Sequence, residues 1–342
     1  MIRAALRDLQ WRRKRFVIAM SGVALVFAMG LIMTGLAASF SLEVDRTLDG
    51  VGASGWAVSD QASGPFTSFT PVPLAAAGDG NASPAMVLRQ TIAGAGGVVD
   101  IIVFGVESGR LGSPVAAEGV ALGGPGEAVV AEDLEGVSVG DTLSIAGRDL
   151  RVVGTVSGQR LFAGLPMVYV ALADAQAIAV QGQPLVTAFL YDQMPATAPA
   201  GLRLMTNAEV KDDVLRPLEN AMSSISFVRF LLWLVAATII GSVLYLQAME
   251  RTRDFAVFKA TGTSTWAIGG GLALQAVVLS LAAAVLAGLL ALVLAPLFPM
   301  NVEIPVSSFV LLPVVTVVVG LLASLISLHR TATVEPALAF GG

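Results

Sequence analysis

The 342-residue sequence contains no cysteine and a single histidine, His329. The lack of thiols excludes disulfides, iron–sulfur clusters, thiolate zinc sites and cysteine catalysis. One imidazole also argues against a histidine-based metal site and against a Ser–His–Asp triad. We therefore expect neither a catalytic site nor a metal site in this chain.

Charge is also scarce. Charged residues make up 13% of the chain and hydrophobic residues 55%, and the mean hydropathy is +0.79. A soluble domain is about a quarter charged, so much of this surface must face lipid. The net charge of −5 leaves no basic face for nucleic acid, and no nucleic-acid partner is expected.

Lysine is the rarest of the common charged residues. None of the three lysines, Lys14, Lys211 and Lys259, follows a glycine. A phosphate-binding P-loop needs a Gly-Lys pair, so the chain itself is predicted not to hydrolyse ATP. Few lysines together with abundant Ala, Gly and Val are typical of a high-G+C bacterial genome.

Four uncharged runs are long enough to cross a bilayer, which takes about 20 helical residues. They predict transmembrane helices over 16–40, 226–249, 266–296 and 306–328. The first run could instead be a signal peptide cleaved after the Ala-Ala-Ser at 37–39. Its 25 apolar residues exceed the usual signal core of about 7–15, so we favour a retained helix.

Basic residues near the helix ends predict the orientation. Arg and Lys dominate residues 1–15 and also lie between the second and third spans, whereas 41–225 holds 20 acidic and 9 basic residues. We expect both termini (1–15 and 329–342) and the segment 250–265 inside the cell, and the domain 41–225 outside.

The outside domain has the pattern of a β-rich fold. Apolar residues recur every four positions near both of its ends, which predicts two helical stalks continuing from the membrane. Between the stalks, a short helix is predicted over 174–180 with Asp174 near its N-cap, and the Pro- and Gly-rich segment 64–83 is expected to be a mobile loop. Eight strands are predicted over 55–59, 85–91, 98–106, 128–131, 142–145, 150–156, 167–170 and 187–190. The expected fold class is thus an α-helical membrane protein with four transmembrane helices and a β-rich α+β extracytoplasmic domain inserted between helices 1 and 2.

Apart from the termini, the segment 250–265 is the only sizeable element that we expect inside the cell. By itself, it could be no more than the charged connector that most membrane proteins carry. The spans lack ionisable residues in their interiors, which argues against an ion-driven carrier. Energy must then arrive from another subunit, and this segment is placed to receive it. Its predicted coupling residues are Glu250, Arg251, Arg253, Asp254, Phe255, Phe258, Lys259 and Gly262.

This segment resembles the coupling segment of the FtsX-like, MacB-type permease family, which includes the LolC/LolE and DevC-like proteins. That family shows Glu-Arg, then an acid, then Lys/Arg-Ala-x-Gly, here at 250–251, 254 and 259–262. Further matching motifs lie at 127–131, 139–145, 168–176 and 334–338, although the arginine that often follows the last motif is Ala339 here. The order of one span, a domain and three spans also matches.

The resemblance implies a type VII ABC transporter permease. Such chains work as dimers, with a second copy or a close paralogue, and bind two copies of a cytoplasmic ABC ATPase. ATP and Mg²⁺ would be held by that ATPase, and no cofactor is expected in this chain. The family transmits motion mechanically, and an extracytoplasmic adaptor or hydrolase is a further expected partner.

The residues expected on the inner side of the membrane can each be assigned a role. We expect Phe255 and Phe258 to anchor in a groove of the ATPase, with charged neighbours as rim pairs and Gly262 ending the helix. Residues 1–15 resemble an amphipathic inner-leaflet helix, in which four basic residues would bind anionic lipid heads: Arg12, Arg13, Lys14 and Arg15. Small residues such as Gly22 and Gly30 allow close helix packing, within one copy or between two.

Four functions remain open at this point. The leading one is a permease subunit that exports or handles a hydrophobic, peptide or envelope-derived substrate. The others are a non-transporting regulator of a cell-wall hydrolase, an amino-acid import permease, and a membrane receptor without an ATPase.

Overall fold

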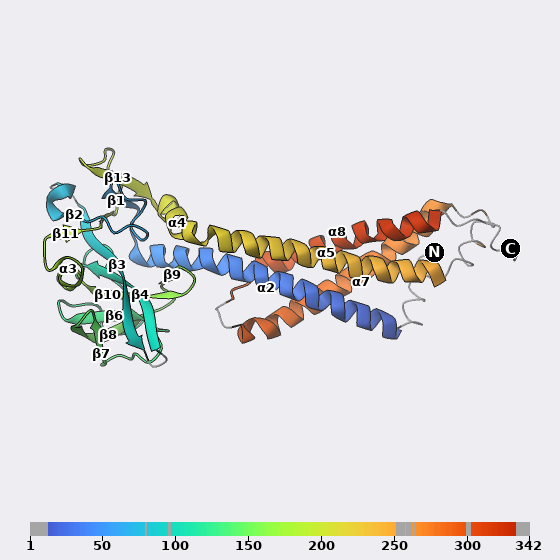
Figure 1. Cartoon of the computed structure of the whole chain (residues 1–342), viewed down its shortest axis with the longest axis horizontal. Helices are drawn as coiled ribbons and strands as arrows, with labels where there is room; N and C mark the ends of the chain where they lie inside the picture. Colours follow the sequence, from blue (N-terminus) through green and yellow to red (C-terminus); the bar gives the residue numbers. More distant parts are fainter. Residues whose placement is uncertain are drawn as a thin grey trace. The chain divides into compact units, whose positions relative to one another are not determined.

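The computed structural model describes residues 13–78, 81–94, 97–250, 257, 262, 264–298 and 302–332 (Figure 1). It separates into two compact units. One comprises residues 1–38 and 221–342, here called the span unit, and the other comprises Ser39–Asn220, here called the inserted domain. The long helix α2 (Arg13–Val51) contributes residues to both units.

The span unit contains four helices that are long and apolar enough to cross a membrane. Besides α2, they are α5 (Glu219–Glu250), α7 (Thr265–Leu294) and α8 (Val306–Ala332), with the short η3 (Ala295–Leu297) after α7. Helix α7 begins one residue before the predicted span 266–296 and ends two residues before the end of that span. Together with the β-rich inserted domain, these helices confirm the predicted fold class.

Each span turns one side inward and leaves apolar side chains exposed on the other. Phe27, Ile240, Ala283 and other side chains from all four helices form one buried cluster. Val285 and Val310 stay 67% and 71% exposed. Exposed apolar surface of this extent is what a lipid-facing helix presents.

The inserted domain is built on one mixed sheet. Among the described residues, its strand order is β13-β1-β12-β3-β4-β10-β6-β8-β5, with β7 on β8 and β9 on β10. The pairs β10–β4 and β6–β8 are parallel, and the other pairs are antiparallel. The strands are β1 (Gly55–Ser59), β3 (Ser83–Gly94), β4 (Gly97–Val106), β5 (Glu118–Gly119), β6 (Glu127–Ala131), β7 (Thr142–Ile145), β8 (Arg148–Val156), β9 (Arg160–Leu161), β10 (Leu165–Ala171), β12 (Ala188–Tyr191) and β13 (Leu202–Thr206).

Two buried clusters lie on opposite faces of this sheet because successive side chains of a strand alternate between faces. One face is covered by the end of α2 and by α4 (Asn207–Leu215), whose Val210 and Val214 are fully buried. The other face is covered by α3 (Leu172–Val180), whose Ala175 is fully buried. The sheet is therefore the middle layer of the domain.

Two local features differ from the sequence expectations. Helix α3 begins at Leu172, so Asp174 lies in its first turn, where its buried carboxylate accepts bonds from Gly126 N at 2.6 Å and Arg148 Nε at 2.8 Å. The segment 64–83 contains β2 (Val72–Pro73), which pairs with β11 (Leu185–Val186), and η1 (Leu74–Ala77). Its Phe66 ring also packs on Trp56 at 5.6 Å, so this segment has tertiary contacts that its composition did not indicate.

Candidate functional site: the stalk junction

The part of α2 that lies in the inserted domain is deeply embedded. Phe40, Val44, Leu48 and Val51 are each at most 6% exposed, which follows from their spacing along one helical face. The helix ends at Val51 and is followed by Gly52, whose φ of +71° suits glycine and whose N–H bonds Leu48 O at 3.1 Å. The α2 end is therefore an integral part of the domain core.

Polar contacts tie the same helix end to the β9–β10 hairpin. Thr47 is fully buried and its hydroxyl donates to Arg160 O at 2.8 Å. At Gly50, an added Cβ would lie 2.2 Å from Gln159 Nε2, so a larger residue there would require the Gln159 side chain to move. Gln159 in turn accepts a hydrogen bond from the buried Tyr169 hydroxyl, and burial raises the pKa of Tyr169 above its ordinary value.

Helix α4 begins with a capping box and contacts the end of α2. Glu209 N bonds the Thr206 hydroxyl while the Glu209 carboxylate accepts from Thr206 N at 2.7 Å. That main-chain hydrogen bond lowers the pKa of Glu209. Asn207, the first residue of the helix, accepts from Trp56 Nε1 at 2.9 Å and donates to Ala53 O at 2.8 Å.

An ion pair joins the two helices directly. Lys211 Nζ lies 2.7 Å from both carboxylate oxygens of Asp45. We call this set of contacts the stalk junction, defined by Asp45, Thr47, Gly50, Trp56, Gln159, Asn207 and Lys211. It fixes the chain entering the domain to the chain leaving it, on one face of the sheet.

Helix α4 passes into α5 (Glu219–Glu250) through a 3-10 segment. Pro217 lies in the short η2 (Arg216–Leu218), which precedes α5. Proline cannot donate to the preceding turn, so the hydrogen-bond ladder is interrupted there. The second stalk is therefore helical from α4 into α5, as the sequence period predicted, with a 3-10 segment between the two helices.

Most predicted coupling residues lie outside the described part of the chain. These are Arg251, Arg253, Asp254, Phe255, Phe258 and Lys259. Glu250 is exposed at the end of α5, and Gly262 has φ of +87°. Arg12 also lies outside the described residues, whereas Arg13, Lys14 and Arg15 form the start of α2.

The residues of the stalk junction were not singled out from the sequence, although Thr206 and Glu209 carry the spacing of a capping box.

Close helix packing in the span unit occurs at glycines other than those singled out. An added Cβ at Gly35 would lie 2.7 Å from an Ile304 side-chain atom, and one at Gly320 would lie 2.1 Å from Ser280 Oγ. Gly22 has open space around it, and Gly30 has ordinary contact with Trp233 at 3.7 Å. Near Gly30, Arg229 stacks over the Trp233 ring at 5.6 Å.

Comparison with known proteins gives consistent results. The model of the FtsX-like permease C-terminal family matches residues 226–336. An uncharacterized ABC transporter permease of Mycobacterium tuberculosis (strain ATCC 25618 / H37Rv) is 44% identical over 349 aligned positions, which cover 100% of both chains. A second such permease of the same strain is 42% identical with the same coverage.

Two solved structures show a more distant likeness. The periplasmic region of MacB from Actinobacillus actinomycetemcomitans matches with a TM-score of 0.34 and 13% identity, covering 52% of this chain and 98% of that chain. The extracellular domain of the noncanonic ABC-type transporter YknZ matches with a TM-score of 0.28 and 14% identity, covering 44% of this chain and 80% of that chain. Neither likeness approaches the full-length similarity of this chain to the mycobacterial permeases.

Proposed function

Because this chain belongs to the FtsX-like family of ABC transporter permeases, we propose that it is a dimeric type VII permease subunit that passes motion from a separate ATPase to its inserted domain. ATP, with Mg²⁺, would be bound and hydrolysed by the ATPase, two copies of which would bind one permease dimer. The work done outside the membrane would be export or handling of a hydrophobic, peptide or envelope-derived substrate.

The observation that carries this proposal is the stalk junction. A lever must be fixed to the part that it moves, because a loose joint would absorb the displacement. Here the α2 end is buried in the domain core, and the Asp45–Lys211 pair and Asn207 fix α4 to the same place. A displacement of either chain end would therefore reach the sheet.

The proposed receiver of the stroke is the segment 250–265. Phe255 and Phe258 would fill a groove of the ATPase, since a few buried aromatic anchors supply most of the binding energy at an interface. Glu250, Arg251, Arg253, Asp254 and Lys259 would form rim pairs that fix the orientation. Arg12 to Arg15 would hold the start of α2 against anionic headgroups.

Co-purification tests this assignment. The double variant Phe255→Ala/Phe258→Ala should lose most of the bound ATPase, while the permease keeps its thermal transition in detergent. Val257→Ala serves as the matched control, because it removes apolar volume from the same segment at an exposed position off the predicted anchoring face. Retention of the ATPase by the double variant at the control level would overturn the anchor assignment.

The orientation is tested by labelling. The natural chain has no cysteine, so single cysteines can be introduced without background. We expect a cysteine at position 257 to react with an impermeant thiol reagent only after the cell is opened, and one at Val115 to react in whole cells. The reverse pattern would contradict the proposed direction of coupling.

A further inference from the structure

Strand β3 has an open edge over half of its length. On one side it pairs with β4 from Ala85 to Gly94, whereas on the other it pairs with β12 only from Ser83 to Ala85. Beyond β12 the neighbouring chain turns away, because β11 pairs with β2 instead. Among the described residues, the hydrogen bond farthest along this side runs from Val87 N to the Thr187 hydroxyl, at 2.7 Å.

The register shows which main-chain groups line this edge. Val87 N points away from β4, since it bonds Thr187 on the opposite side. In an antiparallel pair, residues alternate between bonding the partner strand and pointing away from it. Arg89 and Thr91 share the direction of Val87, and no described residue bonds their N–H or C=O groups on that side. Unpaired strand groups of this kind are a template for another strand.

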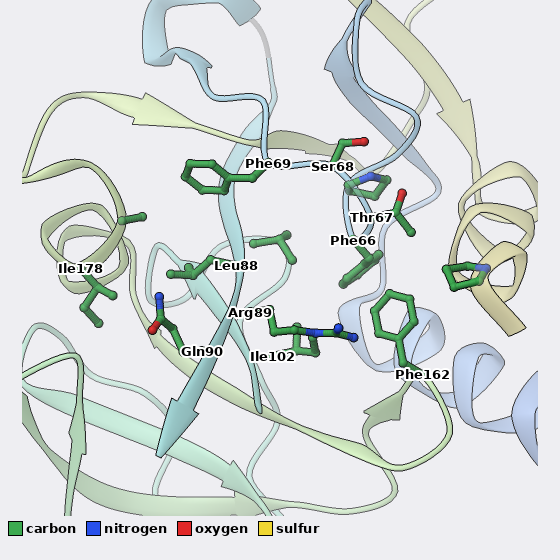
Figure 2. Close-up of a pocket in the computed structure, with 14 residues that line it drawn as sticks. Phe66, Thr67, Ser68, Phe69, Leu88, Arg89, Gln90, Ile102, Phe162 and Ile178 are labelled. Carbon is green, nitrogen blue, oxygen red and sulfur yellow. The ribbon is translucent and has the colours of Figure 1, made fainter. Parts of the chain in front are cut away.

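A cavity of about 500 Å³ wraps around this edge (Figure 2). Four consecutive residues of β3, Val87 to Gln90, line it. Because alternate side chains face opposite sides of a strand, a cavity that touches all four must extend across the edge. Figure 2 shows Leu88 and Gln90 toward Ile178 of α3, and Arg89 toward Phe162.

The walls of the cavity suit an extended peptide. Phe66 and Phe162 form an apolar wall on one side of the edge, and Ile178 and Ala179 form one on the other. A strand added between them would place alternate side chains against each wall. Phe69 on the facing segment is 52% exposed, so apolar surface is already available at the mouth.

Among the described residues that line the cavity, the charged side chain is that of Arg89. The Arg89 guanidinium lies 5.0 Å from the centre of the Phe162 ring, and within the described chain no carboxylate forms an ion pair with it. The ring orients the cation and leaves its donors available for a carboxylate. A ligand with an acidic group beside the edge would therefore complete the site.

We infer that the β3 edge of the inserted domain receives an extended segment of a partner protein as an added strand, with an acidic side chain of that segment beside Arg89. Main-chain hydrogen bonds would give affinity, and the two apolar walls together with Arg89 would give selectivity. A second copy of this chain fits less well, because pairing two β3 edges would bring two Arg89 side chains into one groove. The inference does not depend on ATPase coupling.

The test selects displayed random short peptides against the full chain in lipid nanodiscs. Thr91→Pro removes an N–H that points to the open side, so the β3–β4 ladder is kept. Thr91→Val keeps that N–H and is the matched control. We expect peptides with alternating apolar residues and one acid, whose affinity falls about tenfold in Thr91→Pro and is unchanged in Thr91→Val.

Two further measurements do not depend on the folding of the proline variant. N-methylation of the selected peptide at the residue that faces the edge should abolish binding to the natural chain. Arg89→Gln should weaken the acidic peptide about fivefold and leave its amide analogue unchanged. Loss of the ATPase in the Phe255→Ala/Phe258→Ala variant should not alter peptide binding, so the two proposals fail separately.

Three results would overturn the inference. The first is that no selected peptide binds Thr91→Pro and Thr91→Val with different affinities. The second is equal binding of N-methylated and unmodified peptide, which would make the cavity a site for apolar compounds. The third is efficient cross-linking of two Thr91→Cys chains, which would show that the edge is occupied by a second copy.

Discussion

Lys211 of α4 donates to both carboxylate oxygens of Asp45 of α2 at 2.7 Å, so the chain that enters the inserted domain is paired with the chain that leaves it. The two side chains are partly exposed, at 26% for Lys211 and 47% for Asp45. A pair in this setting contributes little to stability. Its value would lie in fixing the geometry of the two stalks.

A double-mutant cycle tests this distinction. We expect Asp45→Asn and Lys211→Met to be coupled by about 0.2–1 kcal/mol in the free energy of unfolding. The loss in ATP-driven activity should be larger than this small destabilisation would cause. The reversed pair Asp45→Lys/Lys211→Asp should recover part of that activity. A loss of activity no larger than the destabilisation itself would cause would show that the pair has only a structural role.

Asn207 should matter more for stability. Asn207→Ala removes the acceptor of Trp56 Nε1 and the donor to Ala53 O. Since Trp56 is fully buried, its N–H would remain without a partner, at a cost of about 1–3 kcal/mol. The free energy of unfolding in detergent measures this, with Asn207→Asp as the control that keeps the acceptor. Equal destabilisation by both variants would show that the Trp56 bond is not the dominant contact.

The capping box at the start of α4 predicts a pH dependence. The Thr206 hydrogen bonds lower the folded-state pKa of Glu209 below its ordinary 4.5. The stabilisation is therefore present above the ordinary value and is lost as pH falls through the folded pKa. Glu209→Gln should flatten this part of the stability profile. Thermal unfolding from neutral to acidic pH checks it, and identical acid dependence in both proteins would contradict it.

Two glycines of α2 should respond in opposite ways to alanine. Gly35→Ala places a methyl group against Ile304 and Val302, at 2.7 and 2.8 Å, and should cost about 1–3 kcal/mol. Gly22→Ala enters open space and should be neutral or stabilise by up to about 1 kcal/mol, because alanine favours a helix. Thermal unfolding of both variants decides the matter. A stabilising Gly35→Ala would mean that the packing at that point is wrong.

Local sequence patterns were sufficient for the spans and for much of the sheet. The strands over 55–59 and 142–145 have the predicted bounds because their apolar runs are flanked by turn residues. Strand β13 was not predicted, although Leu202 to Met205 include an apolar–polar alternation. Its partner β1 lies far away in the sequence. Such pairing is set by tertiary structure, which a local pattern does not contain.

The functional contacts were harder to predict for the same reason. Asp45 and Lys211, and likewise Trp56 and Asn207, come from opposite ends of the inserted domain and meet only when the sheet forms. The open edge of β3 depends on where β12 stops pairing. The inside residues Phe255 and Phe258 were named from their helical spacing within the segment 250–265, and their role stays a prediction.

The most direct test of the lever is a distance measured across the reconstituted complex. Val115 is 85% exposed, so a spin label on Val115→Cys in the otherwise cysteine-free chain would report on the inserted domains of the two copies in the proposed dimer. Double electron–electron resonance should show different distances between the two spin labels with ATP and with ADP on the ATPase. The Phe255→Ala/Phe258→Ala variant should abolish that difference. The same distance in both nucleotide states, or a change without the ATPase, would contradict the account.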